Sequence, residues 1–141
     1  MNGYSLLELT AALLLLALAS SAVVPAAGRH RDRMLVLTAR ETLVAALRDT
    51  RAEALRTGTA ALHLTAADGR GRIISGDSAF PSFLVDPSGR VSLSLSRGRA
   101  DSEIGFGGLG IGVFANETLE LTAGAARARL VVSSYGRVRR E

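Results

Sequence analysis

The chain opens with a long apolar segment that changes abruptly into an amphipathic one. No charged residue lies between Leu9 and Gly28, where leucine, alanine and valine predominate. At 1.5 Å rise per residue, about 20 such residues in a helix span the hydrocarbon core of a bilayer. Glu8 stands at the start of this segment, where an unpaired carboxylate in lipid would cost several kcal/mol. We therefore expect a membrane-spanning helix whose carboxylate pairs with a group on another chain.

The segment from Met34 to Arg56 has the period of an amphipathic helix. Gly58 follows at a position that commonly ends a helix. The pattern predicts one long helix from Tyr4 to Arg56, kinked or locally unwound at Pro25. Its apolar stripe, which later parts of the chain must cover, recurs at intervals of three and four: Val36, Leu37, Leu43, Val44, Leu47, Ala54 and Leu55.

Short apolar or alternating segments after Gly58 predict β-strands. Turn sequences such as Asp86-Pro87-Ser88-Gly89 separate them. A long helix followed by strands predicts an α+β fold, with the helix packed on antiparallel sheet. The predicted strands are residues 59–66, 72–75, 82–86, 90–96, 118–123 and 128–134.

The glycine-rich stretch Gly105 to Gly112 contains GFGGLG, which matches the pattern G-x-G-x-x-G. A dinucleotide site of this type needs a strand before the glycines and a helix after them. An extended segment begins at Ile111 and no helical pattern follows. We therefore expect a flexible loop or a bulged sheet edge without a nucleotide site.

Composition narrows the chemistry further. The chain has no cysteine, which excludes disulfides and thiolate chemistry. Its two histidines, His30 and His63, are far apart in the sequence. No group of His, Asp or Glu residues has the spacing of a metal site, and no sequence resembles the turn that carries a catalytic serine. We expect a protein that is not an enzyme and that holds no metal or cofactor.

All 17 basic residues are arginine, the net charge is +4, and the C-terminal stretch concentrates this charge. Residues two apart in a strand share a face, so Arg127 with Arg129, and Arg137 with Arg139, form same-face pairs around a turn at Tyr135-Gly136. The two pairs side by side make an electropositive strip, which can bind a phosphate backbone without reading its sequence. The other interpretation is that the arginines protect an exposed sheet edge from pairing with another chain.

The order of residues at the N-terminus resembles the class III signal of type IV pilins and type II secretion pseudopilins. Gly3 and Tyr4 stand where prepilin peptidase cuts and where the methylated N-terminus forms; Glu8 and Pro25 stand at the assembly glutamate and the helix proline. The resemblance implies a short leader (1–3), a transmembrane and assembly helix (4–28), an amphipathic continuation (29–58) and a β-rich globular domain (59–141) with the pilin-like fold. The alternative is a plain signal anchor or a cleaved secretory signal peptide.

The C-terminal stretch resembles the FimT/GspH branch of minor pilins and pseudopilins, through Gly136-Arg137-Val138-Arg139. The resemblance implies a subunit of a type II secretion system or type IV pilus, single-pass in the bacterial inner membrane with its globular domain in the periplasm. Its partners would be other pilins, prepilin peptidase and the inner-membrane assembly platform.

In FimT-type minor pilins of naturally competent bacteria, a Gly-Arg-x-Arg tail contacts DNA. The resemblance therefore leaves open a second function, a DNA-binding minor pilin for natural transformation. A signal-anchored envelope protein unrelated to pili is a third. The residues expected to contact DNA are Arg127, Arg129, Gly136, Arg137, Arg139 and Arg140.

Overall fold

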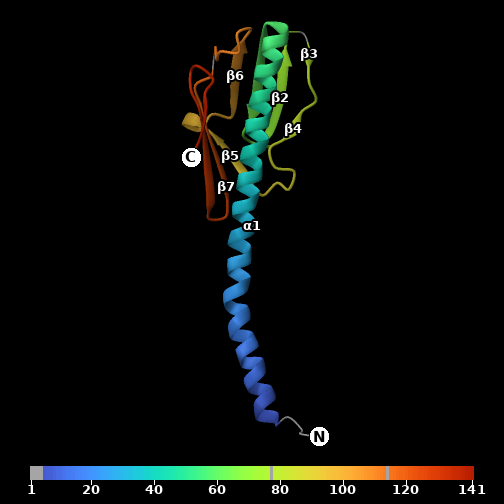
Figure 1. The fold of residues 1–141 in the computed structure, drawn as a ribbon, viewed down its shortest axis with the longest axis vertical. Coiled ribbons are helices and arrows are strands. Elements are labelled where there is room, and N and C mark those ends of the chain that lie inside the picture. Colours follow the sequence, from blue (N-terminus) through green and yellow to red (C-terminus); the bar gives the residue numbers. More distant parts are fainter. Residues whose placement is uncertain (1–4, 77, 114) are drawn as a thin grey trace.

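One long helix forms the axis of the molecule. The computed structural model describes residues 5–76, 78–113 and 115–141, with backbone only for residues 22–25. Helix α1 (Leu6–Thr57) begins at Ser5, whose Oγ accepts a hydrogen bond from the Glu8 N–H at 3.2 Å, and ends at Gly58, whose N–H donates to the Ala54 carbonyl at 2.8 Å (Figure 1). The helix is continuous across residue 25, so the local unwinding predicted at Pro25 does not occur.

The two halves of α1 have different surroundings. The first half extends away from the rest of the chain, and its most apolar stretch, which is long enough to cross a membrane, is not buried at all (Figure 1). The second half packs on the sheets through one stripe. Leu55 was predicted to belong to this stripe but is 57% exposed, because the buried positions continue through Thr50 to Ala54 and turn Leu55 away. The stripe is Val36, Ala39, Leu43, Val44, Ala46, Leu47, Thr50 and Ala54.

Two antiparallel sheets cover this half of the helix. The first has the order β3-β2-β1-β6, with β4 also paired to β2; the second has the order β5-β7-β8-β9. The first contains β1 (Thr59–Thr65), β2 (Arg70–Ser75), β3 (Ser78–Ala79), β4 (Phe83–Leu84) and β6 (Asp101–Gly107). The second contains β5 (Ser92–Leu95), β7 (Glu117–Ala123), β8 (Ala126–Val132) and β9 (Val138–Arg140), and a 3₁₀ turn, η1 (Ser96–Gly98), follows β5. The chain therefore passes from the first sheet to the second and back before it completes the second.

The core lies between α1 and the inner faces of both sheets. Alternating residues point inward, as in β1, where Leu62 and Leu64 are buried, and in β7, where Leu119 and Leu121 are buried. They meet the helix stripe around Leu43. The α+β architecture predicted from the sequence is confirmed.

The first three residues of the glycine-rich stretch belong to a strand at a sheet edge that the sequence pattern did not predict, and residues 108–111 form the loop that follows it. Residues 105–107 complete β6, an edge strand that pairs with β1 along its whole length. Gly112 then returns to bridge Phe106. The strand was missed because Gly105 and Gly107 weaken the alternating pattern, although both pair with β1 residues. Among the residues the structure describes, no helix follows.

Candidate functional site

The assembly residues expected at the N-terminus are described in part. Gly3 and Tyr4 lie outside the described residues. Glu8 is exposed in the first turn of α1, where the helix dipole favours a carboxylate. In the described part of the chain no basic side chain lies within 4.0 Å of it. Its charge is thus available to a group on another chain.

The leucines around Glu8 have the same need for an external partner. Leu7 is 77% exposed, Leu15 69% and Leu16 64%, and none of them contacts the sheets. A continuous apolar surface of this length is stable only in lipid or against other apolar helices. The first half of α1 is therefore built for an environment that the chain does not supply itself.

The register of the C-terminal hairpin decides how its arginines are arranged. In the β8–β9 pairing, Val131 faces Arg139 and Leu130 faces Arg140. Opposed residues share a face of a sheet, so Arg139 lies on the outer face with Arg127 and Arg129. Arg140 lies on the inner face beside α1. The register therefore keeps Arg127, Arg129 and Arg139 together, as the predicted same-face pairs require, and places Arg140 on the other face.

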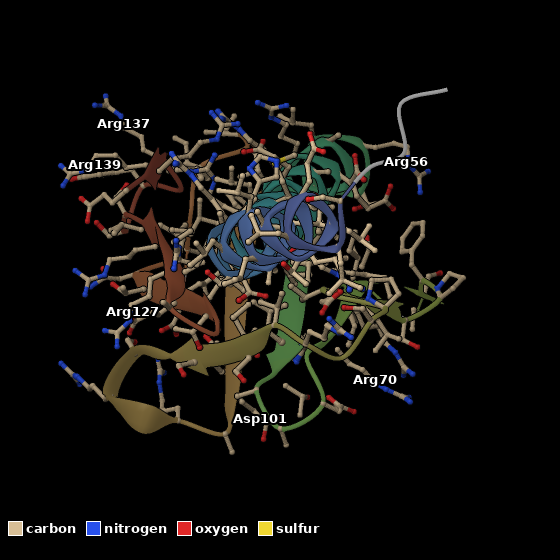
Figure 2. The ribbon with its side chains drawn as sticks, turned by 90° about the horizontal axis from the view of Figure 1, so that it is seen from below. Arg56, Arg70, Asp101, Arg127, Arg137 and Arg139 are labelled. Atoms are coloured by element: carbon tan, nitrogen blue, oxygen red, sulfur yellow. The ribbon has the colours of Figure 1, made fainter. Side chains whose placement is uncertain are left out.

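Two of these arginines have acidic partners. Arg139 Nε lies 2.9 Å from an Oε of Glu141 on the outer face, and Arg140 Nη2 lies 3.1 Å from Oε2 of Glu41 on α1. Arg127, Arg137 and Arg139 extend from the same side of the molecule, away from Arg70 (Figure 2). The five arginines of this part of the chain outnumber the nearby carboxylates, which are Glu141, Glu41 and Glu120, the last of them opposite Arg129 in the β7–β8 pairing.

Gly136 and Arg137 occupy the tight turn between β8 and β9. Gly136 has φ 76°, in the left-handed region, and donates its N–H to the Ser133 carbonyl at 2.8 Å. The Arg137 N–H donates to the Ser133 Oγ at 3.1 Å. The turn thus holds the Arg137 backbone in place while its side chain remains exposed.

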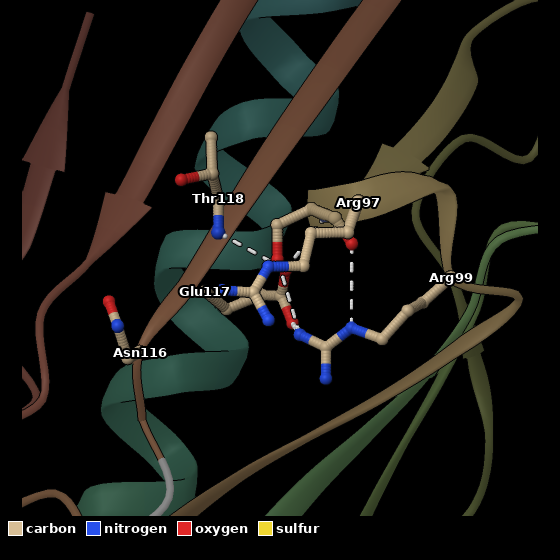
Figure 3. Close-up of a pocket in the computed structure, with 6 residues that line it drawn as sticks. Arg97, Arg99, Asn116, Glu117 and Thr118 are labelled. Atoms are coloured by element: carbon tan, nitrogen blue, oxygen red, sulfur yellow. Dashed lines mark hydrogen bonds and ion pairs between the residues drawn. The ribbon is translucent and has the colours of Figure 1, made fainter.

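A buried carboxylate that sequence reasoning missed joins the two sheets. Glu117, at the start of β7, is only 3% exposed and accepts hydrogen bonds from the Ser96 N–H at 2.8 Å and from the Ser102 hydroxyl. Figure 3 shows Glu117 beside Arg99 and Thr118. Arg99 forms an ion pair with Glu117. Residues from η1, from the position after it and from β6 therefore converge on one side chain of β7.

The charge state of Glu117 follows from these contacts. Burial raises the pKa of its carboxyl, but hydrogen bonds from Ser102 and Ser96, together with the Arg99 guanidinium, outweigh burial and leave the pKa below its usual value. The group is therefore an anion at neutral pH. The signal in the sequence was a glutamate at an inward position of an alternating strand, in phase with Leu119 and Leu121.

The contacts around Glu117 hold the two sheets together and have a structural role. A cleft of about 380 Å³ opens beside it, lined by Arg97, Arg99 and Asn116 among others. In the described part of the chain no group of three or more His, Cys, Asp or Glu residues could hold a metal ion. The carboxylate is already saturated by donors, which leaves it no capacity to act as a base.

The fold defines a class of protein: a long N-terminal helix, half of it unaccompanied, packed through its second half on antiparallel sheets is the pilin-like fold. The type IV minor pilin FimU of Pseudomonas aeruginosa strain PAO1 has this fold, and one crystal form matches with a TM-score of 0.62 and 15% identity over 75% of this chain and 87% of that one.

A second crystal form of FimU matches with a TM-score of 0.58 and 15% identity, over 74% of this chain and 91% of that one. The minor pseudopilin EpsH, from the type 2 secretion system of Vibrio cholerae, matches with a TM-score of 0.60 and 10% identity over 76% of this chain and 96% of that one. No protein-family model matches the sequence, and no curated protein matches it. The predicted pilin-like fold is thus confirmed by structure.

Proposed function

We propose that this protein is a minor pilin or pseudopilin, a non-enzymatic subunit of a type IV pilus or type II secretion system. Prepilin peptidase would cleave between Gly3 and Tyr4 and the new N-terminus would be methylated. Before assembly, the first half of α1 would anchor the protein in the inner membrane as a single transmembrane helix, with the globular domain in the periplasm. The assembly platform would then move it into a fibre or its tip complex.

The observation that carries this proposal is the unaccompanied half of α1 with Glu8 at its start. Lipid covers the exposed leucines before assembly, and the helices of neighbouring pilins cover them afterwards. Glu8 is unpaired within the described chain and would pair with the N-terminal amine of a neighbouring subunit, which removes the cost of a lone carboxylate in an apolar bundle. The likeness of the fold to FimU and EpsH supports the same role.

The test is incorporation into a fibre in the native host. We expect E8A and E8Q to leave the protein in the inner membrane and absent from sheared fibres, while E120Q, a change of a half-buried carboxylate of the globular domain, is incorporated normally. Intact mass should show the loss of three residues and the gain of one methyl group. Normal incorporation of E8A would refute the pilin assignment.

DNA binding is the second candidate function, for a minor pilin acting in natural transformation. It is favoured by the outer-face arginines Arg127, Arg129 and Arg139, with Arg137 beside them on the same side of the molecule. Guanidinium groups suit phosphate oxygens because they donate two parallel hydrogen bonds. Salt-sensitive binding of duplex DNA that R127Q with R129Q weakens is the expected result.

A further inference from the structure

A groove runs between the second half of α1 and the end of the C-terminal hairpin. It has a volume of about 420 Å³ and an apolar floor that includes Phe106. Four arginines line it, two from the helix and two from the hairpin: Arg48, Arg51, Arg137 and Arg140. Among the residues that the structure describes, no acidic one lines the groove. The hairpin arginines were expected at a binding surface, whereas those of α1 were not.

The charge in this groove is largely uncompensated. Within the described ranges no carboxylate lies within 4.0 Å of Arg48, Arg51 or Arg137, and only Arg140 is paired, with Glu41 at 3.1 Å. Arg48 and Arg51 are three residues apart, so they occupy neighbouring positions on the same side of the helix. Like charges at this spacing repel one another, and an anion between them removes the repulsion.

Close backbone packing sets the shape of the groove. A Cβ atom on Gly136 would lie 2.5 Å from Cε1 of Phe106 and 3.2 Å from the backbone nitrogen of Gly112. Only a glycine at position 136 lets the turn lie this close to Phe106. The close approach places Arg137 in the groove next to α1. On the other wall, a Cβ on Gly110 would lie 3.0 Å from Nε of Arg51, so the loop after β6 fits closely against that side chain.

We propose that this groove binds the phosphate backbone of a nucleic acid, with Arg48 and Arg51 of α1 acting together with Arg137 and Arg140. The inference rests on the DNA-binding candidate function and adds to it a second element, the helix. Arginine forks on both walls can each hold a phosphate through two hydrogen bonds. Phe106 and its apolar neighbours would exclude water around those contacts.

A polyanion fits the distribution of charge better than a single anion. Beyond the groove, Arg139, Arg127 and Arg129 follow on the outer face, where Arg139 pairs with Glu141 and Arg129 lies opposite Glu120. A chain of regularly spaced phosphates can engage both faces, whereas one carboxylate of a neighbouring subunit would engage one. Lipid headgroups are out of reach because Arg48 lies about 30 Å along the helix from Gly28, at 1.5 Å per residue.

The experiment measures binding of the full-length protein, in non-ionic detergent, to a fluorescent duplex of about 20 base pairs at about 50–200 mM salt. The groove variant is R48Q with R51Q, which keeps the stems of both side chains. The matched control is R70Q with R72Q, which removes the same charge from the exposed part of β2 on the other side of the molecule. R127Q with R129Q tests the outer face.

We expect R48Q/R51Q to lower the affinity about tenfold or more and to reduce the salt slope by about 2, with R70Q/R72Q near the wild type. R48K/R51K should recover much of the slope, since charge is restored. If R48Q/R51Q behaves like R70Q/R72Q while R127Q/R129Q loses binding, the groove is refuted and DNA binding at the outer face stands. If the wild type binds no DNA at low salt, both DNA assignments fail, and fibre incorporation still tests the pilin role separately.

Discussion

Arg140 and Glu41 are 99 residues apart in the sequence, yet Nη2 of the arginine lies 3.1 Å from Oε2 of the glutamate. The pair joins β9 to α1 at the edge of the arginine-lined groove. The side chains are 43% and 51% exposed, so water screens the interaction and its contribution to folding is small. Its more important effect is on the groove, because Glu41 is the nearest negative charge to a surface that we propose binds phosphate.

The E41Q variant separates these two effects. We expect an unchanged melting temperature, because the ion pair is exposed, and an affinity for duplex DNA raised about two- to fivefold, because Arg140 is released. Fluorescence anisotropy at low salt measures the affinity and differential scanning fluorimetry the melting temperature. An unchanged affinity would show that Arg140 takes no part in binding.

Glu117 should matter much more for stability. In E117Q the amide cannot accept from all the donors that now surround the carboxylate, and Ser102 and the Ser96 N–H lose good partners. We expect a loss of about 1–3 kcal/mol in the free energy of unfolding, measured by urea denaturation. E120Q on the same strand is the control, since Glu120 is only half-buried, and it should be nearly neutral.

The same carboxylate predicts a dependence of stability on pH. The pKa of Glu117 is lowered from 4.5 in the folded protein, so its stabilising effect is complete above about pH 4.5 and is lost as the pH falls through the folded value. The stability difference between wild type and E117Q should therefore be constant near neutral pH and shrink on acidification. A difference that stays constant down to the lowest pH at which both variants fold would contradict this assignment.

The local features of this fold could be predicted from the sequence because they depend on neighbours in the chain. The apolar run before Gly28, the stripe through Leu43 and Leu47, and the cap at Gly58 each produce a recognisable period or turn signal. The strands with clean alternation, such as β7 and β8, were placed within two residues of their ends. Strand β6 was missed because its glycines obscure the pattern.

The tertiary relationships could not be predicted in this way. Nothing local indicates that the chain crosses between sheets at β5 and β6, and this crossing is what brings Ser96 and Ser102 to Glu117. Likewise Arg48 and Arg51 read as a solvated helix face until the hairpin turn is placed beside them. The C-terminal arginines could be recognised as a charged group, but only the β8–β9 register divides them between two faces.

Replacing a leucine by alanine should affect a different property in each half of α1. L43A removes a fully buried side chain and should cost about 2–5 kcal/mol in the free energy of unfolding of the globular domain. L16A removes a side chain that is 64% exposed and should leave that free energy unchanged, but reduce incorporation into fibres. Thermal denaturation in detergent and sheared-fibre immunoblots measure the two effects. A loss of domain stability in L16A would mean that the first half of α1 is part of the folded core.

Gly136 and Gly89 provide a matched test of close packing at the groove. Both have positive φ, 76° and 66°, but a Cβ on Gly89 would meet nothing within 4 Å, whereas one on Gly136 would collide with the ring of Phe106. G89A should therefore cost only the backbone strain, about 1 kcal/mol. G136A adds a steric clash with the floor of the groove and should cost about 2–4 kcal/mol. Urea denaturation of both variants measures the difference, and F106L should recover part of the loss in G136A by making room for the methyl group. Equal costs for G89A and G136A would show that the turn can move away from Phe106, and with it Arg137 from the wall of the groove.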